Sequence, residues 1–549
     1  MSAREAERSA LVTFEPSGCT RGVAIGTTIK QAAAEAGVVL DAPCGGLGTC
    51  GRCLVGVEGA LEPPASDERI LLTETQLAEG IRLACRAAIA GDVVVRPASA
   101  QRPASVRVVE RGDAGEIAVE PPEDRGILGD EPLLGAVVDI GTTTLVVSVV
   151  DLRTAETLGA ASDLNPQYAF GHDVMSRITH AATHGEASLR EPVIAAIESL
   201  ALRALRAAAQ PAERLREIAV AGNTTMIHLL LGIDPAPLGV APYEPAFVQS
   251  LERDAASLGL PALRNARAYV LPGVSAFVGA DITAGLLATR LAERSRPTLF
   301  VDLGTNGEMV LRTPDALVAC STAAGPALEG ATLTHGMRAE TGAIERVSLD
   351  GGRLTVDTID AAPPRGLCGS GLLDLVAVLL EAGVLDFTGR LRTDAGDPLG
   401  ERVVQHDGGR AFEIAPAVYL AQRDVRQVQL ANAAIASGIS LLLDRVGLVP
   451  EDVAELVIAG GFGYHVKAEA LVRLGMIPAA WIDRVSFAGN TAVSGALLAL
   501  LDSAARRRAE ALTRRVETVD LAGHPEFQTR FVAAMRFPKG TQPLREDRP

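Results

Sequence analysis

Four cysteines near the N-terminus have a spacing that could hold an iron–sulfur cluster. Cys44, Cys50 and Cys53 share one glycine-rich loop, and Cys85 follows farther along the chain. Four thiolates are the full ligand set of a 2Fe–2S cluster, and the glycines allow a tight loop whose backbone N–H groups face the sulfurs. Zinc ligands usually come as two close pairs, and disulfides are improbable in a cytoplasmic chain. The spacing therefore predicts a 2Fe–2S site.

The other residues that could ligate a metal lack partners at ligand spacing. Cys19, Cys320 and Cys368 are expected to be buried as small hydrophobic side chains. His228 stands among apolar residues, so a core or helix-cap role is favoured over ligation. No histidine is assigned to a metal.

A second chemical signal is an apolar strand that carries Asp139 and ends in a turn made of Gly141, Thr142 and Thr143. Glycine lets the backbone approach an anion, threonine supplies N–H and O–H donors, and Asp139 is placed to order a hydrated Mg²⁺. The chain has no G-x-x-x-x-G-K-[ST] phosphate loop. We therefore predict a nucleotide phosphate site of another type.

The same corner occurs a second time, again as strand, aspartate, glycine and threonine: Asp302, Gly304, Thr305 and Asn306. Two further apolar strands, at residues 218–222 and 456–460, both end in Ala-Gly. Duplicated strand-to-loop corners indicate two similar lobes. A nucleotide in the cleft between the lobes would be held by one corner from each.

The composition indicates a large globular protein. Its 549 residues leave room for three or four domains, and 48% hydrophobic residues suffice for large cores. A net charge of −16 and a pI of about 5.1 argue against a nucleic-acid binder or an anionic-membrane binder, because both need a basic face. Without a signal-peptide pattern or an apolar run of spanning length, we expect a cytoplasmic protein.

Residues 1–97 form a unit defined by the cysteines. Short strand patterns and one helix pattern suit a small β-grasp domain: strands at 11–14, 22–25, 53–57 and 92–95, and a helix at 28–36. The cysteine loop and these elements resemble the 2Fe–2S ferredoxins of plant and adrenodoxin type. The wider first gap between cysteines is closer to the adrenodoxin spacing.

Three further segments follow this unit. Residues 98–133 are rich in proline and read as a linker, which would let the ferredoxin unit swing between an electron donor and an acceptor. The repeated corners then place one lobe at residues 134–299 and the other at 300–549. The expected fold is therefore multidomain, α+β and α/β, with a β-grasp ferredoxin domain and a two-lobed domain.

The corners resemble motifs of the superfamily that contains acetate and sugar kinases, heat-shock chaperones and actin. The stretches with Asp139 and Asp302 are similar to its two phosphate motifs, and residues 459–463 are similar to its adenosine motif. The resemblance implies an actin-like or hexokinase-like ATPase. It also implies that the two aspartates bind Mg²⁺ and the attacking water, and that Gly460 and Gly461 lie against the adenosine and the α-phosphate.

The whole chain resembles the reductive activators of corrinoid proteins. Four stretches point to that family: residues 222–232, 321–330, 367–374 and 524–538. The resemblance implies ATP-dependent reduction of an inactive cob(II) corrinoid protein to cob(I) for methyl transfer, with the electron passing through the 2Fe–2S cluster from an upstream reductase. It allows a homodimer through the ATPase domain. Because the linker is short, we expect the separate middle domain of some members to be absent.

The segment 320–326 follows the second corner and is rich in small residues, so we expect it to face the corrinoid partner. The Ser321 hydroxyl would then lie near the cobalt and take part in activation. The alternative, favoured by the usual role of serine at such turns, is that Ser321 caps the following helix.

Two other function classes fit the same motifs. A small-molecule kinase with an accessory redox domain would transfer phosphate to a sugar or acid whether or not the cluster is reduced. A nucleotide-dependent redox sensor or interaction module would bind ATP with negligible turnover and prefer no corrinoid partner.

Overall fold

The computed structural model describes residues 9–38, 40, 42, 46, 48, 51, 53–97, 133–330, 332–350, 352–393, 399–406, 408–460 and 466–539. Contacts divide the chain into two compact units, one made of residues 1–104, 164–196 and 229–242, the other of 105–163, 197–228 and 243–549. Except for Leu133, the predicted linker lies outside the described residues. Among the described helices, none is long and apolar enough to cross a membrane.

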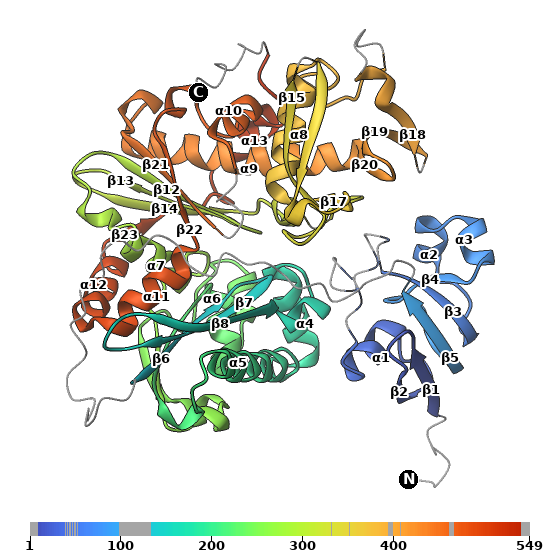
Figure 1. Cartoon of the computed structure of the whole chain (residues 1–549), viewed down its shortest axis with the longest axis horizontal. Coiled ribbons are helices and arrows are strands. Elements are labelled where there is room, and N and C mark those ends of the chain that lie inside the picture. The colour runs from blue at the N-terminus through green and yellow to red at the C-terminus, as the bar shows by residue number, and fades with distance from the viewer. Residues whose placement is uncertain are drawn as a thin grey trace. The chain divides into compact units, whose positions relative to one another are not determined.

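The N-terminal part contains a five-stranded sheet in the order β2-β1-β5-β3-β4, drawn in blue in Figure 1. Its strands are β1 (Ser9–Phe14), β2 (Cys19–Ala24), β3 (Leu54–Leu61), β4 (Ile81–Leu83) and β5 (Ile89–Pro97). The first and last strands, β1 and β5, pair in parallel, as in a β-grasp fold. The predicted ferredoxin-like architecture is confirmed.

Three helices accompany this sheet: α1 (Ile29–Glu35), α2 (Ser66–Leu71) and α3 (Glu74–Ala78). Helix α1 begins with a capping box, in which Thr28 Oγ1 accepts the Gln31 N–H and Gln31 Oε1 accepts the Thr28 N–H. Helix α2 is tied to β4 by a buried ion pair between Glu68 and Arg82, with 2.8 Å from Arg82 Nη2 to Glu68 Oε2. Glu68 Oε1 also accepts the backbone N–H of Leu83 at 3.0 Å.

The first lobe contains a six-stranded sheet in the order β10-β11-β9-β6-β7-β8. Its strands are β6 (Leu134–Ile140), β7 (Thr144–Asp151), β8 (Thr157–Leu164), β9 (Leu215–Gly222), β10 (Leu251–Asp254) and β11 (Arg267–Val270). Strands β6 and β7 form an antiparallel hairpin, and β6, β9 and β11 run parallel. The strands β6 and β7 are buried almost throughout and read as continuous Val-rich runs.

The second lobe repeats this arrangement in the order β22-β21-β12-β13-β14-β23. Its strands are β12 (Thr298–Leu303), β13 (Gly307–Arg312), β14 (Leu317–Thr322), β21 (Glu455–Ala459), β22 (Val485–Gly489) and β23 (Val516–Thr518). Again one hairpin, β12–β13, is followed by two strands, β21 and β22, that run parallel to β12. The predicted duplication is confirmed, because β9 and β21, the strands of the two Ala-Gly sequences, each pair in parallel with the first strand of the hairpin in their sheet.

Two helices pack against each other at the junction of the lobes (Figure 1). Helix α7 (Ala280–Ala288) follows β11, and helix α11 (Thr491–Leu501) follows β22. A Cβ at Gly495 would lie 1.9 Å from the Ala284 carbonyl oxygen, so only glycine allows this close crossing.

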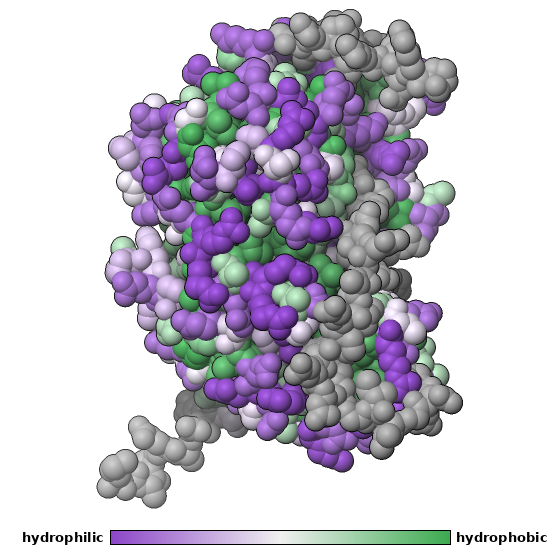
Figure 2. All heavy atoms as spheres, turned by 90° about the vertical axis from the view of Figure 1, so that its left-hand side faces the viewer, coloured by the Kyte–Doolittle hydropathy of each residue, from purple (hydrophilic) through white to green (hydrophobic). Residues whose placement is uncertain are grey.

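The remaining long helices are α4 (Val174–His184), α5 (Ala187–Ala207), α6 (Thr224–Leu231), α8 (Gly369–Glu381), α9 (Gln422–Val446), α10 (Ala468–Leu474), α12 (Ser503–Thr513) and α13 (Phe527–Ala534). Two small sheets are formed by β15 (Ala343–Asp350), β16 (Arg353–Thr358) and β17 (Gly366–Leu367), and by β18 (Val403–His406), β19 (Gly409–Ala415) and β20 (Val418–Ala421). Most of α8 and one face of α9 are buried in the core of the second lobe. On the face drawn in Figure 2, hydrophilic residues predominate and hydrophobic ones show between them.

Candidate functional site

The structure brings two of the four predicted cluster cysteines together. Cys53 directly precedes β3 and Cys85 follows β4, and Leu54 pairs with Leu83 across these antiparallel strands. The two Sγ atoms are 3.3 Å apart, and both side chains are buried. The other two predicted ligands, Cys44 and Cys50, lie outside the described residues.

Two loop glycines near these thiols adopt positive φ angles, which favour glycine. Gly46 has a φ of +102°, and a Cβ there would lie 3.0 Å from Lys30 Nζ and 3.7 Å from Cys85 Cβ. A Cβ at Gly48, where φ is +71°, would lie 2.2 Å from Arg86 Nε. Two buried thiols with such glycines beside them agree with the ligand chemistry of a 2Fe–2S cluster.

A cavity of about 630 Å³ contains the predicted nucleotide residues of both lobes. All described members of the predicted set line it: Asp139, Gly141, Thr142, Thr143, Asp302, Gly304, Thr305, Asn306 and Gly460. The first corner is the turn between β6 and β7, and the second is the turn between β12 and β13. Gly461 lies outside the described residues.

Two predicted aspartates and a third, Asp281, which the sequence did not reveal, are among the acidic residues that line this cavity. Burial raises the pKa of Asp139 to about 7, with a smaller contribution from the Asp281 carboxyl. Burial and the charges of Asp281 and Asp139 raise the pKa of Asp302 to about 7. Buried carboxyls that raise one another's pKa favour a bound cation.

Mg²⁺ fits this donor set as a hydrated ion. Oxygen ligands and retained waters are the usual coordination of Mg²⁺, which needs few carboxylates from the protein. Within the described ranges, no group of three or more His, Cys, Asp or Glu side chains has the arrangement of a complete metal site. A cation here would therefore need waters or nucleotide phosphates to complete its coordination.

Two asparagines that the sequence analysis missed hold the first corner. Asn223 Nδ2 donates to Thr142 Oγ1 at 2.9 Å, and Asn490 Nδ2 donates to Asp139 Oδ2 at 3.1 Å. The amide oxygen of each asparagine accepts a backbone N–H in the first turn of the helix that follows, α6 or α11. Both belong to a Gly-Asn-Thr tripeptide, which occurs after β9 and again after β22. This second repeat was a signal that could have identified them.

A third missed residue, Glu329, connects the corners. Its carboxylate accepts the hydroxyl of Thr143 at 2.5 Å and the hydroxyl of Thr305 at 2.6 Å. Glu329 ends the short helix η7 (Pro326–Glu329). It lies in the stretch 321–330, which pointed to the family, but its bonds to the two corners are tertiary contacts that the stretch alone did not predict.

The segment around Ser321 differs from the prediction. Cys320, Ser321 and Thr322 are the last residues of strand β14, so the predicted loop 320–326 begins in a strand. The capping alternative is wrong, because Gly325 occupies the cap position of η7. The half-buried Ser321 hydroxyl lies 3.4 Å from Oε1 of Glu308, which lines the nucleotide cavity.

The remaining cysteines and His228 are mostly as expected. Cys320 and Cys368 are buried, and burial raises the pKa of the Cys320 thiol. Cys19 is only partly buried, so the expectation of full burial is wrong for it. His228 is fully buried, its Nδ1 lies 2.8 Å from the Thr224 carbonyl oxygen, and burial lowers its pKa. Its core role is confirmed.

Three family models match successive parts of the chain. Residues 12–90 match the 2Fe-2S iron-sulfur cluster binding domain, residues 134–294 the RACo middle region, and residues 296–546 the C-terminal domain of RACo, an ASKHA domain. The expectation that the middle domain is absent is wrong, since the first lobe itself matches the middle region. The chain therefore contains a 2Fe–2S domain and a nucleotide-binding ATPase domain.

Individual relatives agree with these matches. Over 423 residues, the chain is 36% identical to the corrinoid activation enzyme RamQ of Eubacterium limosum, covering 74% of this chain and 71% of RamQ. It is 27% identical to the [Co(II) methylated amine-specific corrinoid protein] reductase of Methanosarcina barkeri, covering 66% and 69% of the two chains. The solved structure of a reductive activator for a corrinoid, iron–sulfur protein is 30% identical, with a TM-score of 0.71 over 96% of this chain and 98% of that one. The chain thus belongs to the RACo family of corrinoid activation proteins.

Proposed function

We propose that this protein uses ATP to drive the reduction of a corrinoid protein from inactive cob(II) to cob(I), and that its own 2Fe–2S cluster delivers the electron. The observation that carries the proposal is the presence, in one chain, of a buried cysteine pair in a β-grasp domain and a two-lobed acidic nucleotide cavity. Two relatives bear the names of a corrinoid activation enzyme and a Co(II) corrinoid protein reductase.

The corners of the cavity have separate tasks in this function. The hydroxyls and backbone N–H groups of Thr142, Thr143 and Thr305 bind nucleotide phosphates. Asp139 and Asp302 hold hydrated Mg²⁺, which neutralises phosphate charge and lowers the pKa of water bound to it. Gly460, with a φ of +112°, packs so closely on the second corner that a Cβ would lie 2.4 Å from the Leu303 carbonyl oxygen. Together with Gly461, it lies against the adenosine.

ATP is needed because the electron moves energetically uphill. Each 100 mV of unfavourable potential costs about 2.3 kcal/mol for one electron. A bias between two conformations can offset a cost of this size if nucleotide and partner both bind the active conformation better. That conformation would favour transfer of the electron from the cluster to the corrinoid.

We also propose an electron donor, an oligomeric state and a cellular compartment for this protein, and a role for Ser321. An upstream reductase loads the cluster with electrons, and the ATPase domain forms a homodimer. The four cluster thiols are kept reduced in the cytoplasm. Ser321 is the hydroxyl that approaches the cobalt, which requires the end of β14 to face the partner.

One experiment tests the proposal directly. The cluster-loaded protein is mixed with a cob(II) corrinoid protein and a strong reductant, and cob(I) absorbance is followed with and without ATP. We expect cob(I) to accumulate only with ATP. Equal rates without ATP, or no cob(I) in either case, would refute the proposed function. Phosphate transfer to a small molecule that is independent of cluster reduction would instead indicate a kinase.

A further inference from the structure

Glu329 holds one hydroxyl from each phosphate corner. Thr143 comes from the β6–β7 turn of the first lobe, and Thr305 comes from the β12–β13 turn of the second. Both hydroxyls donate to the same carboxylate, at 2.5 Å to Oε2 and 2.6 Å to Oε1. A single side chain therefore spans the two corners.

A carboxylate in this position uses the donors that a phosphate would use. Carboxylate and phosphate oxygens are both strong acceptors, and hydrogen bonds to an anionic acceptor are short and strong. A terminal phosphate that reached both threonine hydroxyls would have to take them from Glu329. Because a phosphate and the Glu329 carboxylate are both anions, they would also repel each other if both lay next to these threonines.

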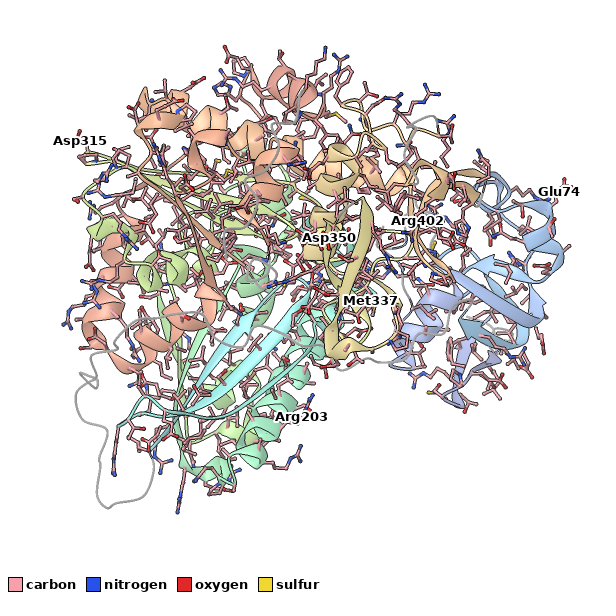
Figure 3. All side chains as sticks on the ribbon, turned by 45° about the horizontal axis from the view of Figure 1, so that its top comes forward. Glu74, Arg203, Asp315, Met337, Asp350 and Arg402 are labelled. Atoms are coloured by element: carbon pink, nitrogen blue, oxygen red, sulfur yellow. The ribbon has the colours of Figure 1, made fainter. Side chains whose placement is uncertain are left out.

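Backbone contacts hold the segment around Glu329 in place. Gly325 donates its N–H to the carbonyl oxygen of Thr305 at 2.8 Å, so the segment before Glu329 is attached to the second corner. Gly330 has a φ of +75°, and a Cβ there would lie 2.0 Å from the carbonyl oxygen of Met337. Met337, labelled in Figure 3, in turn donates its N–H to Leu367 in β17 at 2.8 Å.

Strand β14 and its Ser321 directly precede this segment. Only residues 323–325 separate the end of β14 from the start of η7. A movement of Glu329 and η7 away from the threonines would therefore reach the strand end through the six residues 323–328.

Resting on the proposed function, we propose that Glu329 is the specificity-determining residue of the nucleotide site. Its carboxylate competes with the terminal phosphate of a nucleoside triphosphate for Thr143 and Thr305. A nucleoside diphosphate binds with Glu329 still in place. The free protein thus disfavours the triphosphate, and a partner that draws η7 away from the corners raises the affinity for ATP. By reciprocity, ATP raises the affinity for that partner by the same factor.

The test compares the affinities of Mg²⁺-AMP-PNP and Mg²⁺-ADP for the cluster-loaded full chain by titration calorimetry. Replacing the carboxylate in Glu329→Gln removes two charge-assisted hydrogen bonds to the threonines, so the ratio Kd(AMP-PNP)/Kd(ADP) falls by about tenfold or more. Glu329→Asp keeps the charge, but it is one methylene shorter and cannot span both hydroxyls, so the ratio falls in the same direction.

The matched control is Glu345→Gln, which removes one charge from the lining of the same cavity. Because it removes a cavity charge without removing the bonds to Thr143 and Thr305, it lowers the ratio less than Glu329→Gln does.

Other outcomes overturn the inference. A ratio that rises in Glu329→Gln places Glu329 among the groups that bind the triphosphate, and an unchanged ratio excludes competition. If Glu329→Gln does not fold, as judged by the fluorescence of Trp481, which is buried in the same lobe, the shorter aspartate variant decides by the same criteria. Wild-type protein that binds neither nucleotide contradicts the proposed function itself, so the two failures are distinguishable.

Discussion

Replacing Asp302 by asparagine should abolish nucleotide-dependent activity and yet stabilise the nucleotide-free protein. Burial raises the pKa of Asp302 from its ordinary value of 3.8 to about 7, and the neighbouring carboxyls add to the rise. An acid with a higher pKa in the folded chain than in the unfolded chain destabilises the folded state once it is ionised. Wild-type stability therefore falls as the pH rises from about 4 to about 7.

The size of the effect follows from the two pKa values. The rise from 3.8 to about 7 corresponds to about 4 kcal/mol of lost stability at pH 8. Asparagine has the same shape and no charge, so Asp302→Asn removes this cost. The gain should reach about 4 kcal/mol at most at pH 8 and shrink toward zero near pH 4.

The assay uses the only tryptophan of the chain. Trp481 is fully buried in the second lobe, which also contains Asp302 on β12. Urea unfolding followed by its fluorescence therefore reports on the correct lobe. The control is Asp315→Asn, because Asp315 is exposed on the same lobe (Figure 3) and loses its charge without relieving burial.

Mg²⁺ and nucleotide should reverse the order of stability. A ligand that binds only the folded state stabilises it by RT ln(1 + [L]/Kd), where [L] is the free ligand concentration. Mg²⁺-ATP should stabilise the wild type and leave Asp302→Asn unchanged. The reasoning is refuted if Asp302→Asn is no more stable than the wild type at pH 8 without nucleotide, or if its advantage does not diminish at low pH.

Three further substitutions test the nucleotide site, the iron–sulfur cluster and the Ser321 hydroxyl separately. Asp139→Asn should spare the cluster absorption spectrum and abolish ATP-stimulated corrinoid reduction; loss of the spectrum would instead indicate a folding role. Cys85→Ser should remove the visible absorption of the cluster while calorimetry still detects ATP binding, because the nucleotide cavity lies in another part of the chain. Ser321→Ala should slow corrinoid activation with ATP hydrolysis intact, and unchanged activation kinetics would exclude a role for this hydroxyl at the cobalt.

The two phosphate corners could be predicted from local sequence because each corner is a continuous strand and turn. The aspartate, glycine and threonines of one corner lie within a few residues, so their order alone predicts how they converge. Asp281 could not be found in this way. It lies in the first turn of α7, and it reaches the cavity because α7 crosses α11 at Gly495.

The short elements β4 and α2 of the ferredoxin domain could not be predicted from local sequence either. Strand β4 covers only Ile81–Leu83 and has too few residues to show an alternating pattern. Helix α2 has six residues, a length at which an isolated helix is marginal in water. The buried ion pair between Glu68 and Arg82 secures it from outside the helix. The contacts that stabilise β4 and α2 come from residues outside these elements, so no local pattern predicts them.

The duplicated lobes are unequal in how they hold the first corner. The first corner receives hydrogen bonds from both lobes: Asn223 of the first lobe bonds Thr142, whereas Asn490 and Glu329 of the second lobe bond Asp139 and Thr143. Both second-lobe contacts involve groups that a nucleotide and its Mg²⁺ would need. A triphosphate that displaces Glu329 from Thr143 would therefore break one of the contacts that join the lobes, even if each sheet stays rigid. A site built in this way converts nucleotide occupancy into a change at the lobe junction, which is what an ATP-driven electron transfer requires.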